Sequence, residues 1–197
     1  MRFPITAIVG RRGFGKTAMM TAIGIKCYQE DYPIFANYHL EIPYTYMTLQ
    51  ELAELPPNLH DCVVLMDEFH MGADAYDFFI KRTRDITKLV TQIRKRRITF
   101  FFTTQYLSQV AKRIRDQVDY IYMMRPQGNG VFTAYITDPH LPYEHQIINV
   151  ITEDLKPIFP FYDTDEMIDV DGSTNDSYLV EEELNNELID MFEGQGA

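Results

Sequence analysis

Short runs of consecutive apolar residues recur along most of the chain, and polar or turn-forming residues bound each of them. Three of these runs, at 5–9, 62–66 and 98–103, contain mostly aliphatic, aromatic and β-branched side chains. Runs of this length are too short for helices, and strands buried on both faces of a parallel sheet have this pattern. Further runs at 34–38 and 120–124 predict two more strands. The pattern therefore predicts a mainly parallel central sheet.

Longer apolar patterns with a helical period separate these runs. Residues 17–32 are apolar on most faces, which predicts a helix packed against the sheet, and residues 49–55 predict a short helix. In 84–97, and again in 107–118, apolar residues recur at helical spacing while Lys and Arg occupy other positions. These two segments predict amphipathic helices with a basic face.

The last regular elements predicted from the pattern form a hairpin. A Gly-rich turn at 127–130 joins the strand at 120–124 to a second strand-like segment at 131–137. The prolines at positions 139, 142, 157 and 160 predict irregular backbone beyond it. Taken in order, the elements predict an α/β fold with a mainly parallel central sheet, flanking helices and an antiparallel edge hairpin.

The turn after the first strand has the sequence of a phosphate-binding loop, G-x-x-x-x-G-K-T. Glycine permits the backbone conformations that bring several N–H groups around a phosphate, and the following helix directs its positive end there. We expect Lys16 to reach the β and γ oxygens of ATP and the Thr17 hydroxyl to ligate Mg²⁺. An ordinary glycine turn is the alternative. The predicted nucleotide-binding residues are Gly10, Arg11, Arg12, Gly13, Phe14, Gly15, Lys16 and Thr17.

Polar side chains also follow two other buried strands. Asp67 and Glu68 come directly after the run at 62–66, which is the Walker B pattern. Asp67 is expected to hold Mg²⁺ opposite Thr17, and Glu68 to polarise the water that attacks the γ-phosphate. Gln105 follows the run at 98–103 and can hydrogen-bond the γ-phosphate or that water. Acids exposed to solvent and a plain strand-end amide are the alternatives.

Charge is distributed unevenly along the chain. The formal net charge is −11, but residues 163–197 contain twelve acids and no Lys or Arg, so the remainder stands at +1. Residues 81–115 contain eleven bases against the single acid Asp85. Such a basic stretch suits the phosphates of duplex DNA, and a solvated helix with cations near its C-terminus is the alternative. The composition predicts a P-loop ATPase domain at 1–162 and an acidic, partly disordered tail at 163–197.

Three further features restrict the class of protein. No apolar run reaches 18 residues and no signal segment is recognisable, which predicts a soluble intracellular protein without direct membrane insertion. Cys27 and Cys62 lie in apolar stretches without C-x-x-C spacing, so we expect both to be reduced. The histidines lack the spacing of metal ligands.

In their order, these motifs resemble the RecA-like (additional-strand, catalytic-Glu) P-loop NTPases, and within them the HerA/FtsK superfamily of DNA-pumping ATPases. The chain is especially similar to the small genome-packaging ATPases of icosahedral viruses with internal membranes, including archaeal viruses. The resemblance covers roughly residues 5–137. It rests on the phosphate loop, Val-Val-Leu-Met-Asp-Glu at 63–68, Arg-Lys-Arg-Arg at 94–97, Phe-Thr-Thr-Gln at 102–105, and Arg113-Ile-Arg115 followed by Asp119.

The resemblance implies an ATP-hydrolysing motor that translocates double-stranded DNA during genome packaging, with ATP and Mg²⁺ as cofactors. Members of this group act as homo-oligomers, typically hexameric rings, in which a neighbouring subunit supplies an arginine. The candidates are Arg84, Arg113 and Arg115, and we expect the last two on the side of the sheet where strand ends and ligands gather. Arg11 and Arg12 could instead act in cis. Capsid or portal-vertex proteins are further expected partners, and the host cytoplasm or the virion is the expected location.

Other functions are compatible with the same motifs. The chain also resembles the Zot-like assembly ATPases of filamentous phages, which usually include a membrane-spanning helix, and a plasmid-transfer assembly ATPase would share the same motifs. A nucleotide-gated interaction module, whose basic helix contacts another protein, belongs to a different class. A small-molecule kinase ranks lower, because Glu68 and Gln105 suit the activation of water.

Overall fold

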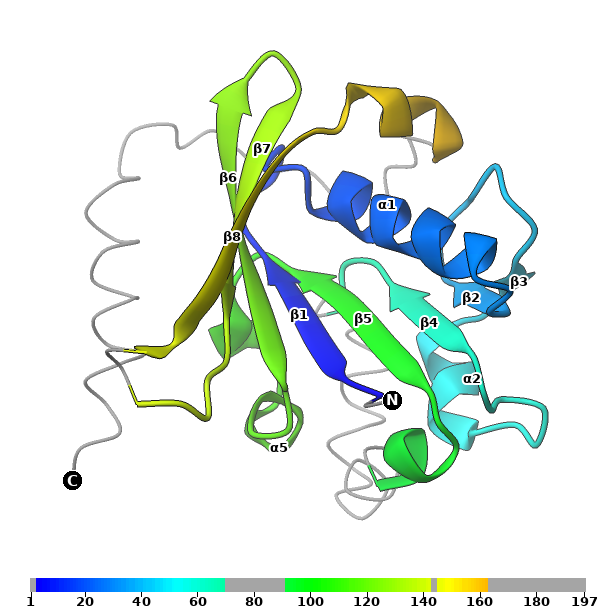
Figure 1. The fold of residues 1–197 in the computed structure, drawn as a ribbon. Helices are drawn as coiled ribbons and strands as arrows, with labels where there is room; N and C mark the ends of the chain where they lie inside the picture. Colours follow the sequence, from blue (N-terminus) through cyan, green and yellow to red (C-terminus); the bar gives the residue numbers. More distant parts are fainter. Residues whose placement is uncertain (1–2, 70–90, 143–144, 163–197) are drawn as a thin grey trace, which may run out of the picture. The chain divides into compact units, whose positions relative to one another are not determined.

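The computed structural model of this chain describes residues 3–69, 91–142 and 145–162. These residues belong to one compact unit, Met1–Asp165. Within it, an eight-stranded sheet has the strand order β3-β2-β4-β5-β1-β6-β7-β8 (Figure 1). The predicted tail at 163–197, and residues 84–90 of the predicted basic helix, lie outside the described residues.

The parallel part of the sheet contains all five strands that the apolar runs predict. Its strands are β1 (Ile5–Val9), β2 (Ile34–Ala36), β3 (Thr45–Tyr46), β4 (Val63–Met66), β5 (Thr99–Thr104) and β6 (Tyr120–Gly128). β1 lies between β5 and β6, and β4 lies on the other side of β5. The register pairs Val9 with Thr104 and Met66 with Phe102, so β1, β4 and β5 end at the same edge. That edge is where open α/β sheets bind ligands.

An antiparallel extension completes the other side of the sheet. β7 (Val131–Thr137) pairs with β6, as the predicted hairpin requires, and β8 (Ile147–Asp154) pairs with β7 and forms the edge. β8 was not predicted, although its sequence contains an apolar, β-branched run at 147–152, because the neighbouring prolines favour irregular backbone. Six of its eight residues are exposed in the structure. Pro142 and Pro157 lie outside the strand rather than interrupting it.

Helix α1 (Lys16–Gln29) covers one face of the sheet (Figure 1). Ala18 and Met19 of this helix belong to the same buried cluster as Leu65 of β4. A capping box, in which Thr48 and Glu51 exchange hydrogen bonds, begins α2 (Leu49–Glu54). Among the described helices, none has the length and apolar composition needed to span a bilayer. The remaining helical segments are η1 (Leu107–Gln109), α5 (Lys112–Arg115), η3 (Lys156–Phe161) and residues 91–95.

The prediction of one helix over 107–118 is wrong. η1 and α5 are separated by residues with extended ψ angles, Val110 and Ala111. The apolar stripe is nevertheless buried, since Val110, Ile114 and Val118 are each at most 3% exposed. Two short turns thus bury the side chains that a continuous helix would have buried, and the spacing of apolar residues does not distinguish the two.

Candidate nucleotide-binding site

The phosphate loop directly follows β1, the strand that lies between β5 and β6. The Gly10 N–H donates a hydrogen bond to the Thr104 carbonyl at 3.3 Å, which ties the loop to β5. Gly13 and Gly15 have φ angles of 79° and 75°, in the left-handed region that favours glycine. A Cβ on Gly15 would lie 2.8 Å from the Phe132 ring of β7. Residue 15 must therefore be glycine for the loop to pass β7 and enter α1 in this conformation.

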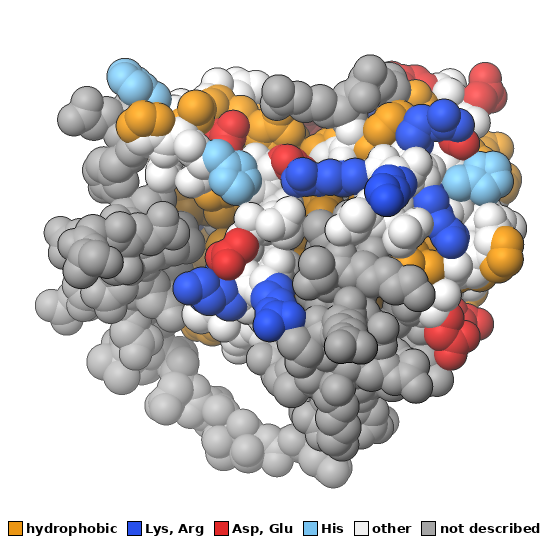
Figure 2. Space-filling view, turned by 90° about the horizontal axis from the view of Figure 1, so that it is seen from below, with side chains coloured by type: hydrophobic (Ala, Val, Ile, Leu, Met, Phe, Trp, Pro, Cys, Tyr) orange, Lys and Arg blue, Asp and Glu red, His pale blue; other side chains and the backbone are white. Residues whose placement is uncertain are grey.

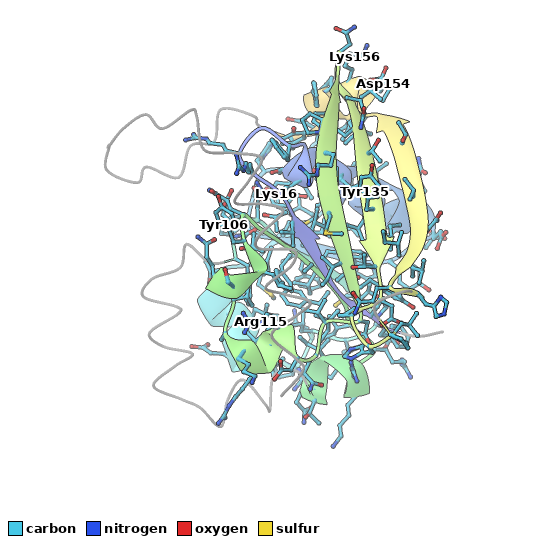
Figure 3. All side chains as sticks on the ribbon, turned by 90° about the vertical axis from the view of Figure 1, so that its left-hand side faces the viewer. Lys16, Tyr106, Arg115, Tyr135, Asp154 and Lys156 are labelled. Carbon is cyan, nitrogen blue, oxygen red and sulfur yellow. The ribbon has the colours of Figure 1, made fainter. Side chains whose placement is uncertain are left out.

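Lys16 is the first residue of α1 and is only 5% exposed. Its Nζ donates to the Arg11 carbonyl at 3.2 Å and lies 3.9 Å from Glu68 Oε1, so the side chain curls back over the loop (Figure 3). Burial lowers the pKa of Lys16, and the nearby Glu68 carboxylate opposes that effect. A buried cation at the positive end of a 14-residue helix is suited to attract a polyanion.

Asp67 follows β4 and faces Thr17 and Thr103. The Thr17 hydroxyl lies 3.2 Å and 3.1 Å from the two carboxylate oxygens of Asp67 and donates to them. The Thr103 hydroxyl donates to Asp67 Oδ1 at 2.5 Å, because pairing of Met66 with Phe102 places Asp67 beside Thr103. The expected pair of Thr17 and Asp67 is therefore brought together.

Glu68 has a φ angle of 47°, which is uncommon for a residue with a Cβ. Its N–H donates to Thr103 Oγ1 at 2.9 Å, and 24% of its side chain is exposed. Burial raises the pKa of Glu68, Lys16 opposes the rise, and the Asp67 charge adds to it. A carboxyl group with a raised pKa beside a buried ammonium is suited to accept a proton.

Two residues near the acids were missed by the sequence analysis as functional candidates. Thr103 of β5 is fully buried, and Asn37 directly follows β2. The Asn37 amide accepts from the Asp67 N–H at 2.6 Å and donates to the Asp67 carbonyl at 2.9 Å. A polar residue at the end of an otherwise apolar strand was the available signal. The lateral order β2-β4-β5, which brings both residues to Asp67, could not be read from the sequence.

Gln105 lies at the same edge of the sheet. It follows Thr104 of β5, whose carbonyl accepts the hydrogen bond from Gly10 of the phosphate loop. The side chain is half-buried. The structure thus places Gln105 next to the loop, and its contact with the γ-phosphate or water stays a prediction.

The structure does not place Arg113 and Arg115 near the phosphate loop. Both lie on α5, close before Asp119, which accepts a hydrogen bond from the Ile5 N–H at the start of β1. α5 is therefore at the amino-terminal edge of the sheet, and Figure 3 shows Arg115 well apart from Lys16. The expectation that these arginines lie where strand ends and ligands gather is wrong, because the chain must return to the amino edge to begin the parallel strand β6. Arg84 lies outside the described residues.

The basic tract at 94–97 also lies at the amino-terminal edge. Arg94 forms an ion pair with Asp119 at 3.1 Å, and Arg97 forms one with Asp61. Arg96 donates to the carbonyls of Leu55 and Pro56, at 3.0 Å and 2.7 Å. Figure 2 views the molecule from this side and shows Lys and Arg side chains interspersed with Asp and Glu. Three of the four tract residues therefore hold local structure together.

The side chains at the carboxyl edge fit a magnesium nucleotide. Mg²⁺ takes oxygen ligands and is commonly held by one or two protein groups together with phosphates and water. The hydroxyl of Thr17 and the carboxylate of Asp67 supply such oxygens next to the phosphate loop. Within the described part of the chain, no group of three or more His, Cys, Asp and Glu residues could hold a metal by itself. The oxygen ligands therefore suit a metal that arrives with a phosphate.

Comparison with known proteins supports this fold. The sequence matches no protein-family model and none of the curated proteins. Its structure is similar to the N-terminal domain of zonular occludens toxin from Neisseria meningitidis, with a TM-score of 0.61 and 18% identity over 83% of this chain and 100% of that chain. A second solved structure, which is an ATPase domain, aligns with a TM-score of 0.50 and 9% identity over 78% of this chain and 81% of that chain.

A third solved structure is B204, the DNA-packaging ATPase from Sulfolobus turreted icosahedral virus. It aligns with a TM-score of 0.46 and 14% identity over 77% of this chain and 97% of that chain. The identities to the first two structures are low, so their likeness bears on the fold alone. The mainly parallel sheet, antiparallel extension and flanking helices confirm the predicted fold class. The chain is therefore a P-loop NTPase in fold.

Proposed function

We propose that this protein is an Mg²⁺-dependent ATPase that couples hydrolysis to the translocation of double-stranded DNA, and that its task is to package a viral genome into a capsid. The observation that carries the ATPase assignment is the convergence of four side chains at one edge of the sheet. Lys16, Thr17, Asp67 and Glu68 come from two segments far apart in the sequence, and hydrogen bonds and an ion pair link them.

Each group has a distinct task in this proposal. Lys16 and the N–H groups of the loop hold the β- and γ-phosphates, while Thr17 and Asp67 hold Mg²⁺. The bound metal would neutralise charge on the phosphate oxygens. Glu68 accepts a proton from the attacking water, whose oxygen bonds to the γ-phosphorus as the bond to the ADP oxygen breaks. Gln105 orients that water or the γ-phosphate.

We also propose that hydrolysis needs a second copy of the chain, as part of a ring. The position of Arg115, far from its own Lys16, supports action on a neighbour rather than in cis. Arg113 and Arg84 are the other candidates. Subunits with Lys16→Ala and with Arg115→Ala are each expected to be inactive alone. Mixed rings should regain ATPase activity if the arginine works in trans. If the mixtures remain inactive for each of the three candidate arginines, the proposal of action in trans is contradicted.

The DNA-coupled part of the proposal is tested by measuring phosphate release with and without linear duplex DNA. We expect DNA to stimulate turnover, and moderate salt to remove the stimulation because phosphate contacts are salt-sensitive. Exposed lysines at the amino edge, Lys95 and Lys112, support a surface of this kind. The Lys16→Ala variant is the control for contaminating ATPases. Turnover that ignores DNA at low salt would contradict translocation while leaving the ATPase assignment intact.

A second candidate function is an assembly ATPase of the Zot-like kind. The likeness to the zonular occludens toxin domain, which extends over 83% of this chain and the whole of that domain, supports it. The same site would then drive the assembly or export of a particle rather than the movement of DNA. ATP turnover that is insensitive to DNA and is stimulated by the proteins of the particle being assembled would favour this function.

A further inference from the structure

Thr103 joins the two acids that follow β4. It is the fifth residue of the six-residue strand β5 and its exposure is 0%. Its hydroxyl donates to Asp67 Oδ1 at 2.5 Å and accepts from the Glu68 N–H at 2.9 Å. A threonine hydroxyl has a single proton, which here is donated to Asp67, while the hydroxyl oxygen accepts the Glu68 N–H. One buried oxygen thus contacts both the proposed metal-holding residue and the proposed base.

We propose that Thr103 is a positioning residue that holds Asp67 and Glu68 in one geometry, so that metal binding and water activation depend on the same hydroxyl. This inference rests on the proposed ATPase function, and it does not depend on DNA. Glu68 occupies the left-handed region, with φ at 47°, where a residue with a Cβ needs support from its surroundings. The hydrogen bond from its N–H to Thr103 supplies that support at the backbone, next to the side chain that would accept the proton.

Asn37 holds the same turn from the opposite side. β4 lies between β2 and β5, and Asn37 follows β2 while Thr103 belongs to β5. The Asn37 amide bonds both the N–H and the carbonyl of Asp67, at 2.6 Å and 2.9 Å. The backbone of Asp67 and its carboxylate are therefore fixed by side chains from two flanking strands. Outer-shell hydrogen bonds of this type commonly change metal affinity or activity about 10–100-fold when they are removed.

The test compares Thr103→Val, which keeps the shape and removes the hydroxyl, with Thr103→Ser, which keeps the hydroxyl. For Thr103→Val we expect kcat to fall about 10–100-fold and the Mg²⁺ concentration for half-maximal activity to rise several-fold. The KM for ATP should stay within about twofold, because the phosphate loop is untouched. Thr103→Ser should restore most of kcat and of the Mg²⁺ response.

Thr137→Val is the matched control for the loss of a buried threonine hydroxyl. Thr137 is 2% exposed and donates to the Ile121 carbonyl at 3.4 Å, near the amino-terminal end of β6. This variant should leave kcat and the Mg²⁺ response unchanged. If Thr103→Val does not fold, Asn37→Ala is a second variant for the same measurements. It should also raise the Mg²⁺ concentration needed for half-maximal activity and leave the KM for ATP unchanged.

The outcomes separate this inference from the proposed function. If the wild-type protein hydrolyses ATP and Thr103→Val matches its kcat and Mg²⁺ response, the inference fails and the ATPase stands. The inference is also overturned if Thr103→Val loses kcat and ATP affinity equally and Thr103→Ser does not restore them. That result would indicate that Thr103 has only a structural role. If the wild-type protein does not hydrolyse ATP, the proposed function fails. The effect of Thr103→Val on Mg²⁺-dependent ATP binding then decides whether Thr103 positions Asp67.

Discussion

The two edges of the parallel sheet both carry charged residues, but they use them differently. At the carboxyl edge, the side chains of Lys16 and Glu68 are 5% and 24% exposed. The charge of Asp67 acts on the pKa values of both. At the amino edge, Arg94 and Arg97 are 47% and 60% exposed, and each is paired with one carboxylate. Burial is the main cause of the pKa shifts of Lys16 and Glu68, whereas hydrogen bonds from the exposed Arg97 lower the pKa of Asp61, and water screens that pair. The comparison distinguishes a reactive edge from a structural one.

The largest expected effect concerns the base at the carboxyl edge. Changing Glu68→Gln removes the group that accepts the proton from water, and we expect kcat to fall about 10²–10⁴-fold. ATP should remain bound, because Lys16 and the loop still hold the phosphates. Phosphate release and the nucleotide retained after gel filtration measure the two effects. Glu54→Gln, at the exposed end of α2, is the control. Turnover near the wild-type rate in Glu68→Gln would contradict the assigned role.

A second prediction separates backbone strain from steric clash within the phosphate loop. Gly13 and Gly15 both have positive φ, but a Cβ on Gly13 meets nothing within 4 Å, whereas one on Gly15 meets the Phe132 ring at 2.8 Å. Gly13→Ala should cost roughly 1–2 kcal/mol of unfolding free energy from strain alone. Gly15→Ala adds overpacking of about 1–3 kcal/mol and should weaken ATP binding more. Denaturant unfolding and nucleotide titration measure both, and equal losses would contradict the packing argument.

The sequence was sufficient to predict the parts of the site that are local. A phosphate loop after one strand and an Asp-Glu pair after another could be brought together by the rule that parallel strands end at one edge. That rule places Thr17 beside Asp67, as the structure has it. Thr103 and Asn37 could not be assigned, because their contacts depend on which strands flank β4.

Two errors have different causes. Arg115 was expected at the carboxyl edge, but a parallel strand must begin at the amino edge, and α5 lies there. The strand β8 contains an apolar, β-branched run at 147–152, but the prolines on either side of it favour irregular backbone and led to the miss. The first error concerns the path of the chain through the sheet, and the second concerns the weight given to prolines that lie outside the strand.

A third prediction concerns the amino edge, where Arg96 and Lys95 are neighbours with different surroundings. Arg96 donates to two backbone carbonyls, and Lys95 is exposed. Arg96→Met should lower the free energy of unfolding by about 1–3 kcal/mol through lost hydrogen bonds, with ATP turnover per folded molecule unchanged. Lys95→Met should change stability by less than about 0.5 kcal/mol. If Lys95 contacts DNA, its removal should reduce the salt slope of DNA binding by about 1.

Two results with Arg96→Met and Lys95→Met would contradict these expectations. Equal stability of Arg96→Met and Lys95→Met would mean that the carbonyl contacts of Arg96 contribute nothing to the fold. An unchanged salt slope in Lys95→Met would remove this lysine from the DNA-binding surface. Chemical denaturation and DNA binding at several salt concentrations separate the two results.

The smallest expected effect is a difference between two glutamates in the same chain. Glu51 accepts hydrogen bonds from the Thr48 N–H and hydroxyl, and these lower its pKa below the ordinary value of 4.5. Burial, and to a lesser extent Asp67, raises the pKa of Glu68 above the same value. In an NMR titration of the side-chain carboxyl carbons, Glu68 should therefore titrate at higher pH than Glu51. Glu68→Gln and Glu51→Gln assign the two resonances.

The two shifts have opposite consequences for stability. Glu51 has a lowered pKa, so its contribution is present above the pKa of the unfolded chain and is lost as pH falls through the folded-state value. Glu68 has a raised pKa, so its contribution is full below the unfolded value and is lost as pH rises through the folded-state value. Lys16→Met removes the cation that opposes the rise, and the pKa of Glu68 should then increase further. An unchanged pKa on removing Lys16 would show that the two side chains do not interact as their 3.9 Å separation implies.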